Sequence, residues 1–175
     1  NVIKHLQIDN GSILDLACGK GRYAYYLAEK GFDVVGLDLS KESISYANTM
    51  YQSPNLEFYV HDMRLPFRIN YFDYIFNFFT SLGYFNDLKE NEKVFESMHS
   101  GLKDDGYILI DFMNAEKVIH NLVPRENKFI DDYHFYIRKE VDNGKIIKHI
   151  QIEKEEKMWL FKEEVQILMQ HHFHT

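Results

Sequence analysis

The stretch from Ile13 to Gly31 constrains the fold more than any other part of the chain, and it reads ILDLACGKGRYAYYLAEKG. An apolar run with an aspartate in its middle reaches two glycines that are one residue apart, and a helix-like pattern follows. Gly31 suits the end of that helix, because glycine tolerates the left-handed conformation found there. The stretch therefore predicts a buried strand, a loop almost free of side chains, and a helix.

Strand-like and helix-like segments alternate from this point through the first two thirds of the chain. Strands are predicted at residues 12–18, 32–40, 56–63, 71–79 and 107–114, and helices at residues 22–30, 41–50 and 87–103. Such alternation favours an α/β fold, in which a doubly wound and mainly parallel sheet has helices on both faces. The strands are nearly continuous apolar runs, which is typical of a sheet that is covered on both faces.

The pattern changes after Asn114. Residues 115–168 contain long strand-like stretches and no clear helix. Asn143 and Gly144 separate two of these stretches and suit a type I′ turn, in which both central residues have positive φ. We expect an antiparallel β-hairpin addition after the fifth strand, with a third strand around residues 158–168, within a single domain that spans residues 1–175.

Composition narrows the classes of function. The chain has 20 Lys and Arg against 27 Asp and Glu, a net charge of −7, and it has no long basic block, so nucleic acid is not an expected partner. The single Cys18 excludes an internal disulfide and suits a reducing compartment. No signal peptide or membrane-spanning run is found, so we expect a cytoplasmic protein without a membrane partner.

Three aspartates fall at or near the ends of successive predicted strands. They are Asp15, Asp38 and Asp62. The carboxyl ends of parallel strands meet at one edge of a sheet, and ligands of open α/β sheets bind at that edge. Asp38 lies 17 residues after Gly21 and suits the two hydroxyls of a ribose. The sequence therefore predicts a site for an adenosine-type ligand.

The glycine loop alone leaves the ligand open. Gly19, Gly21 and Ala24 complete a Gly-x-Gly-x-x-Ala pattern, which also occurs in dinucleotide-binding proteins, and a tight turn without a ligand is a further interpretation. Asp15 separates the two ligand classes, because a carboxylate repels a pyrophosphate. A ligand with an ammonium group and a positive centre is favoured instead.

The pattern D-x-x-C-G-x-G, which begins at Asp15, resembles the first motif of class I S-adenosylmethionine-dependent methyltransferases. The resemblance extends from about Ile13 to Leu168 and implies a Rossmann-like fold, with S-adenosylmethionine as the cofactor. By resemblance, Asp15 helps to hold the amino group of the cofactor, Asp38 holds the ribose and Asp62 the adenine amino group. The implied cofactor-binding residues are Asp15, Ala17, Gly19, Gly21, Asp38, Leu39, Asp62, Met63 and Asn77.

Residues 77–85, NFFTSLGYF, follow the fourth predicted strand, and in this family that position borders the reactive methyl group. The stretch resembles small-molecule members, including sugar-amine and glycine N-methyltransferases, and it lacks the Asn-Pro-Pro-Tyr form of nucleic-acid methyltransferases. An amine or hydroxyl of a small molecule is therefore the expected acceptor. Tyr84 is the first candidate to take or relay its proton, followed by Asp111 and His134. Asp111 and Asn114 are candidates for lining the acceptor pocket.

Members of this family usually have seven strands, so the terminal strands of the fold are expected to be missing here. The open edge of the fifth strand favours a homodimer, or a hairpin that covers it. A cofactor-binding module without methyl transfer is the main alternative function, and an NAD-dependent oxidoreductase is a weaker one. His171, His172 and His174 are not expected to form a metal site, and Cys18 is expected to be a small packing residue.

Overall fold

The computed structural model describes residues 2–79, 81–85 and 87–167, and the chain divides into two compact units. The first, which we call the core unit, comprises residues Asn1–Ser81 and Asp87–Phe112. The second, which we call the sheet unit, comprises residues Leu82–Asn86 and Met113–Thr175. The sequence predicts one domain with an addition from residue 115, and the sheet unit starts within two residues of that point but also takes in residues 82–86.

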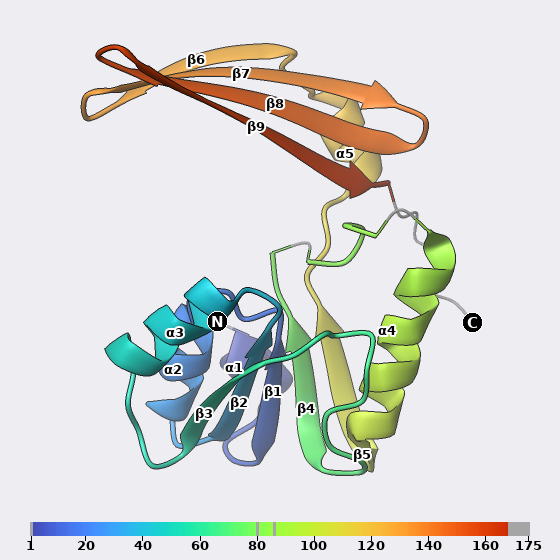
Figure 1. Cartoon of the computed structure of the whole chain (residues 1–175). Coiled ribbons are helices and arrows are strands. Elements are labelled where there is room, and N and C mark those ends of the chain that lie inside the picture. The colour runs from blue at the N-terminus through green and yellow to red at the C-terminus, as the bar shows by residue number, and fades with distance from the viewer. Residues whose placement is uncertain (1, 80, 86, 168–175) are drawn as a thin grey trace. The chain divides into compact units, whose positions relative to one another are not determined.

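The core unit contains a parallel sheet of five strands in the order β3-β2-β1-β4-β5 (Figure 1). Its elements are α1 (Val2–Leu6), β1 (Ser12–Leu16), α2 (Arg22–Ala28), β2 (Asp33–Asp38), α3 (Lys41–Met50), β3 (Leu56–Val60), β4 (Phe72–Asn77), α4 (Leu88–Gly101) and β5 (Leu102–Ile110). This confirms the predicted doubly wound α/β fold. The strand order reverses between β1 and β4, and such a reversal opens a crevice at the carboxyl ends of these strands.

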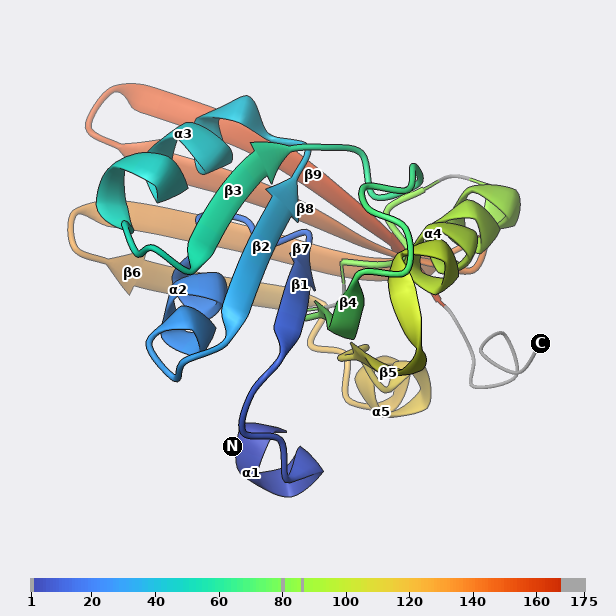
Figure 2. The same ribbon diagram turned by 90° about the horizontal axis from the view of Figure 1, so that it is seen from below.

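Helices α2 and α3 pack on one face of this sheet (Figure 2). The buried cluster on that face consists of Ile13, Ala24, Leu27, Ala28, Phe32, Val34, Ile44, Ala47, Phe58 and Phe76. Alternation along the strands turns Leu14 and Ile75 to the other face. There Gly101, at the end of α4, lies beside Ile75. Helices therefore lie on both faces, and the central strands β1, β2 and β4 are mostly buried, whereas the edge strands β3 and β5 are largely exposed.

Strand β5 begins five residues before its predicted start. Leu102 pairs with Phe72, but the next pair joins Tyr107 to Tyr74, so the ladder shifts register between them. Gly106 makes this irregularity possible, because a Cβ atom there would lie 2.9 Å from the carbonyl oxygen of Asp73.

Helix α3 has the predicted bounds. Its start is set by Ser40, whose hydroxyl accepts a hydrogen bond from the Ser43 backbone at 3.1 Å.

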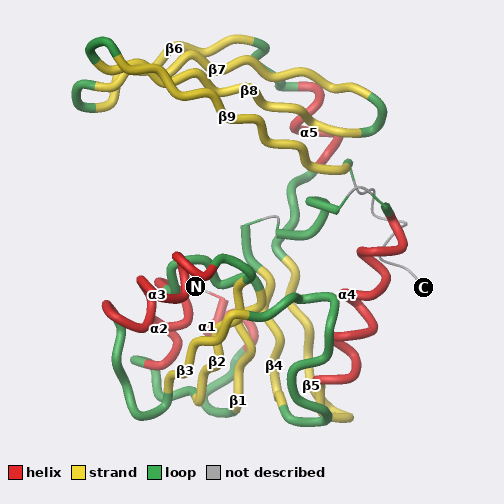
Figure 3. Tube along the Cα trace, in the orientation of Figure 1, coloured by secondary structure: helices red, strands yellow, loops and turns green. Residues whose placement is uncertain are grey.

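The sheet unit consists of one short helix and an antiparallel sheet in the order β6-β7-β8-β9 (Figure 3). Its elements are α5 (Ala115–His120), β6 (Arg125–Ile130), β7 (Tyr133–Asp142), β8 (Lys145–Lys154) and β9 (Lys157–Gln166). The predicted hairpin is confirmed: Asn143 and Gly144 join β7 to β8 with φ values of 46° and 73°. Strand β9 is the predicted third strand.

Two elements of the sheet unit were not predicted. Helix α5 has only six residues, too few to show a helical period. Its N-cap is Asn114, whose side chain accepts a hydrogen bond from the Lys117 backbone at 3.0 Å. Strand β6 reads RENKFI, which is too polar to show the alternation of a half-buried strand.

In the described part of the chain, every helix falls short of the length and apolarity that a bilayer crossing requires.

Candidate functional site

A tight loop of residues 17–21 joins β1 to α2. Ala17, Gly19 and Gly21 all have positive φ, at 63°, 55° and 79°. The Cys18 N–H donates to the carbonyl of Leu37 at 2.9 Å, which ties the loop to β2. A Cβ atom at Gly19 would meet nothing within 4 Å. The backbone at Gly19 is therefore open to close approach by a ligand.

Asp15 lies on β1 beneath this loop, and its side chain is only 2% exposed. The backbone N–H of Ala24, on the first turn of α2, donates a hydrogen bond to the carboxylate. The Oδ2 atom is buried without a hydrogen-bond partner. Burial, with a smaller contribution from the charge of Asp38, raises the pKa of Asp15 to about 7. A buried acceptor without a partner is costly, and a cationic donor at Oδ2 would remove that cost.

Asp38 ends β2 and holds the glycine loop in place. Its Oδ2 accepts a hydrogen bond from the Gly19 N–H at 2.8 Å, and its Oδ1 accepts one from the Ser40 N–H at 2.8 Å. The sequence predicted ribose binding here but not this structural role. Each carboxylate oxygen can accept a second hydrogen bond, so the two roles are compatible.

Replacing Asp38 with alanine is expected to lower the affinity for an adenosine-type ligand by about 1–3 kcal/mol, through the loss of charge-assisted hydrogen bonds. The free energy of unfolding should fall by about 1–3 kcal/mol as well, because the N–H groups of Gly19 and Ser40 lose their acceptor. Urea unfolding and calorimetry measure the two effects. Asp38→Asn keeps one carbonyl acceptor and should lose less stability; equal stability of the wild type and Asp38→Ala would contradict the structural role.

Asp62 follows β3, as predicted, but its carboxylate already has a partner. The Arg64 Nε atom donates to Oδ1 at 2.9 Å, the Arg64 backbone N–H donates to the same oxygen at 3.0 Å, and the guanidinium forms an ion pair with Asp62. These hydrogen bonds lower the pKa of Asp62. Arg64 also pairs with Glu90 of α4. The Asp-x-Arg spacing was the signal for this cluster, and the sequence reasoning missed it.

The apolar and amide candidates are placed differently from one another. Leu39 is 67% exposed beside Asp38 and offers an apolar surface to a ligand, while Met63 is half-buried in the loop after β3. Asn77 is buried at the end of β4, where its Nδ2 donates to the carbonyl of Leu16 at 2.8 Å. Asp15 pairs with Phe76, so alternation puts Asn77 on the opposite face of the sheet from Asp15.

An aromatic cluster follows β4. The Tyr23 ring lies 5.4 Å from the ring of Phe78 and 5.1 Å from that of Phe79. Phe79 is 60% exposed with a φ of 61°, an unusual conformation for a bulky residue. Its N–H donates to the Asp111 carboxylate at 3.3 Å, and the Asp111 N–H donates to the carbonyl of Asn77 at 2.8 Å. Strain of this kind clusters at functional sites.

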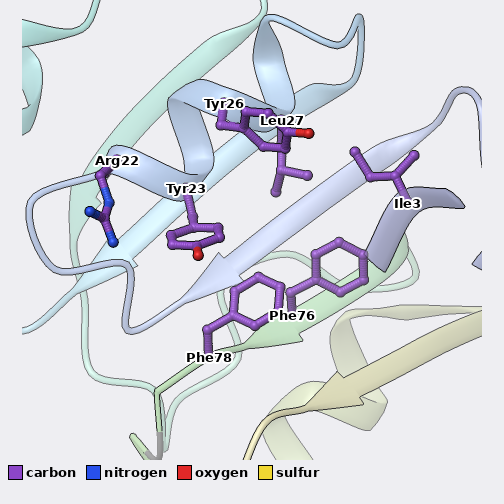
Figure 4. A pocket seen from close by; sticks show the side chains of 7 residues that line it. All are labelled: Ile3, Arg22, Tyr23, Tyr26, Leu27, Phe76 and Phe78. Atoms are coloured by element: carbon purple, nitrogen blue, oxygen red, sulfur yellow. The ribbon is translucent and has the colours of Figure 1, made fainter. Parts of the chain in front are cut away.

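A cavity of about 550 Å³ adjoins this aromatic cluster (Figure 4). It is lined by Ile3, Arg22, Tyr23, Tyr26, Leu27, Phe76 and Phe78. Helix α2 connects it to the buried carboxylate, since Ala24 contacts Asp15 while the two preceding residues line the cavity. The sequence reasoning did not single out Arg22, although its position directly after Gly21 was the available signal.

The other predicted catalytic and acceptor residues divide between the two units. Asp111 belongs to the core unit, whereas Tyr84, Asn114 and His134 belong to the sheet unit. Burial, followed by the charge of Glu163, raises the pKa of Tyr84, which favours the neutral phenol. Asn114 caps α5, and the His134 ring stacks on Phe129 with a centroid distance of 3.9 Å.

Cys18 is partly buried, and burial, followed by the charges of Asp15 and Asp38, raises the pKa of its thiol. A thiol with a raised pKa is a poor nucleophile, which is compatible with the prediction that Cys18 is a small packing residue. Among the residues with described positions, no group of three or more His, Cys, Asp and Glu side chains could hold a metal ion. His171, His172 and His174 lie outside the described residues.

A five-stranded parallel sheet with a glycine loop after its first strand and aspartates near the strand ends places the chain among Rossmann-like α/β proteins and matches the fold of methyltransferases. The family model of the methyltransferase domain matches residues 8–165, so the chain belongs to the class I S-adenosylmethionine-dependent methyltransferase family. YqeM of Bacillus subtilis, whose name places it among methyltransferases, is 37% identical over 112 residues, which cover 63% of this chain and 45% of YqeM. The chain spans about half the length of the curated relatives it matches.

Solved structures show the same fold. An S-adenosylmethionine-dependent methyltransferase from Clostridium acetobutylicum has a TM-score of 0.80 at 22% identity, covering 98% of this chain and 74% of that one. The S-adenosylmethionine-bound amino pentose methyltransferase CalS10 from Micromonospora echinaspora has a TM-score of 0.75 at 15% identity, covering 98% and 75%. At these identities the likeness concerns the architecture alone.

Proposed function

We propose that the chain binds S-adenosylmethionine at the carboxyl ends of β1 and β2 and transfers its methyl group to a nitrogen or oxygen atom of a small molecule. The observation that carries this proposal is the buried carboxylate of Asp15, whose Oδ2 lacks a hydrogen-bond partner. The cofactor has an ammonium group that would supply the missing donor. A pyrophosphate at the same loop would instead be repelled, which disfavours a nicotinamide dinucleotide.

The residues around Asp15 fit the remaining parts of the cofactor. Gly19 leaves open space where its backbone can approach the methionine portion, and the Asp38 oxygens can each accept a further hydrogen bond from the ribose. Leu39 presents exposed apolar surface to the adenine. Tyr23 and Phe79, which are 37% and 60% exposed, supply aromatic surface for a positive sulfur. When bound, the cofactor supplies an activated methyl group.

The family supports a transferase, and similar architectures support a small acceptor. CalS10 is an amino pentose methyltransferase, and KedS8 from Streptoalloteichus, which shares the fold with a TM-score of 0.74, is a sugar N-methyltransferase. Methyl transfer is an in-line displacement, so alignment of the acceptor atom, the methyl group and the sulfur supplies much of the rate. The aromatic cluster after β4 is the part of the core unit suited to position an acceptor.

Isothermal titration calorimetry tests the proposal. We expect saturable binding of S-adenosylmethionine and S-adenosylhomocysteine, and no binding of NAD at the same concentrations. Release of S-adenosylhomocysteine with a panel of small acceptors then measures transfer. Binding without any transfer would favour a cofactor-binding module instead of an enzyme, whereas binding of NAD alone would overturn the ligand assignment.

A further inference from the structure

We propose that the cavity beside the glycine loop receives the methyl acceptor, and that this acceptor is a carboxylic acid with an apolar body. The inference rests on the proposed methyl transfer and names the class of substrate. It replaces the amine or hydroxyl acceptor that the sequence favoured with a carboxylate oxygen.

The lining of the cavity selects an apolar body. Six of its seven residues are aliphatic or aromatic, and Leu27 and Phe76 belong to the buried core cluster. Its volume of about 550 Å³ falls within the range of small-molecule pockets. In Figure 4, Arg22 and Ile3 lie at opposite ends of the lining, with the aromatic rings between them. A ligand with a charged head and an apolar tail matches this polarity.

Arg22 supplies the charge at one end of the cavity. Its guanidinium lies over the Tyr23 ring, 5.3 Å from the ring centroid. This contact with the ring uses no hydrogen bond, so the guanidinium N–H groups can still donate to a carboxylate. No salt bridge within the described ranges, 2–79, 81–85 and 87–167, involves Arg22. An anionic group on the ligand would therefore be its ionic partner.

A carboxylate suits the transfer chemically, because it reacts without a general base. One carboxylate oxygen forms the new bond to the methyl carbon while the bond from that carbon to sulfur breaks, and the bonding pair passes to sulfur. The products are a methyl ester and a neutral thioether, so no proton has to be removed. An amine or alcohol would require a base in addition.

The electrostatics of the cavity favour the same acceptor. A carboxylate and a sulfonium lose their opposite charges as the reaction proceeds, so apolar surroundings destabilise the separated charges more than the transition state. The rings of Tyr23, Phe76 and Phe78 supply such surroundings. Arg22 would hold one carboxylate oxygen at the rim and leave the other oxygen to attack.

The test uses straight-chain acids from hexanoate to dodecanoate, with decanol and decylamine as matched controls. Methyl transfer from S-adenosylmethionine is followed by release of S-adenosylhomocysteine. We expect the acids to be methylated and KM to fall about fourfold for each added methylene until the cavity is filled. Decanol and decylamine should react at least tenfold more slowly. Where turnover is too slow to measure, binding of decanoate to the protein saturated with S-adenosylhomocysteine replaces it.

Two variants and one control test whether the acid binds in the cavity. Arg22→Gln should raise KM or Kd for decanoate about tenfold to a hundredfold, through loss of a charge-assisted hydrogen bond. Lys30→Gln removes a positive charge that lies outside the glycine loop, over the Tyr26 ring at 5.5 Å from its centroid, and should change KM or Kd less than twofold. Ile3→Trp shortens the cavity at the end opposite Arg22 and should weaken binding of dodecanoate more than binding of hexanoate.

Each possible result bears on the inference. Saturable binding of S-adenosylhomocysteine without any binding of decanoate overturns the acceptor and leaves the proposed function intact. The acceptor is overturned too if Arg22→Gln lowers the affinity for S-adenosylhomocysteine by as large a factor as the affinity for decanoate. Arg22 would then pair with the carboxylate of the cofactor. Preferred methylation of decylamine or decanol has the same consequence. Failure to bind S-adenosylhomocysteine at all instead rejects the proposed function itself.

Discussion

Replacing Asp15 with asparagine is expected to make the free protein more stable at pH 8. Burial raises the pKa of Asp15 from its ordinary value of 3.8 to about 7, so the ionised form is disfavoured in the folded protein. A difference of this size corresponds to about 4 kcal/mol, and the asparagine amide offsets part of it because it needs partners of its own. We therefore expect a gain of about 2–4 kcal/mol above pH 7.

The sign of this effect depends on pH. Below about pH 3 the carboxyl is mostly neutral in both the folded and unfolded states, so the variant and the wild type should be nearly equal in stability. As pH rises from 4 to 7, the unfolded state loses its proton before the folded state does, and the wild type loses stability relative to the variant. Above pH 7 the difference is constant. Urea unfolding of both proteins from pH 4 to pH 8 measures this curve.

The same substitution should weaken binding of S-adenosylmethionine by tenfold to a hundredfold, about 1.5–3 kcal/mol. Binding of the ammonium group requires ionised Asp15, so the affinity of the wild type should fall about tenfold for each pH unit below 7. The α-amino group of the ligand begins to lose its proton near pH 8, which limits affinity on the alkaline side. The Asp15→Asn variant should lose the dependence on the acid side.

Asp33→Asn provides the matched control, because Asp33 lies exposed at the start of β2. We expect it to change the free energy of unfolding by less than about 0.5 kcal/mol and to leave the affinity for S-adenosylmethionine unchanged. A wild-type affinity that stays flat between pH 6 and pH 8 would argue against an ammonium group at Asp15. So would an Asp15→Asn variant that is less stable than the wild type at pH 8.

Gly21→Ala is expected to lower the free energy of unfolding by about 2–5 kcal/mol. A Cβ atom at Gly21 would lie 2.5 Å from the Phe58 ring, and the φ of 79° adds strain for any residue with a side chain. The ring also packs closely against Gly36, where an added Cβ atom would likewise lie 2.5 Å from it, so it has little room to move away. Urea unfolding measures the loss.

Gly19→Ala is the matched comparison for this prediction. Gly19 also has positive φ, but a Cβ atom there meets nothing within 4 Å, so we expect a loss of only about 1 kcal/mol. The added methyl group should instead weaken binding of the cofactor, because it fills the space that the cofactor would approach. Phe58→Leu in the Gly21→Ala background should recover part of the stability, whereas a Gly21→Ala variant as stable as Gly19→Ala would refute the packing argument.

Much of the core unit could be predicted from local pattern. Each strand and helix of a parallel α/β unit is a continuous segment with its own apolar period, so alternation along the chain is enough to predict the layers. The loop after β1 was predictable because Gly19 and Gly21 are needed for its backbone conformation. The turn at Asn143 was predictable for the same local reason, while α5 and β6 were missed because neither is long or apolar enough to show a period.

Partners far apart in the sequence were not predictable in this way. The pattern of strands predicted that Asp15, Asp38 and Asp62 lie near one edge of the sheet. It did not predict that Asp38 accepts a hydrogen bond from the Gly19 backbone, or that Arg64 forms an ion pair with Asp62. The missing partner of Asp15 Oδ2 likewise became visible only in the folded chain.

By itself, the sequence determined the class of fold, the glycine loop and the position of the acidic residues at the ends of the strands. These features follow from the conformational preferences of short segments. Tertiary structure decided the pKa of Asp15, the packing of Phe58 against Gly21, and the cavity that Arg22 lines. Burial and packing are properties of side chains brought together from distant segments, so local preferences do not encode them one residue at a time.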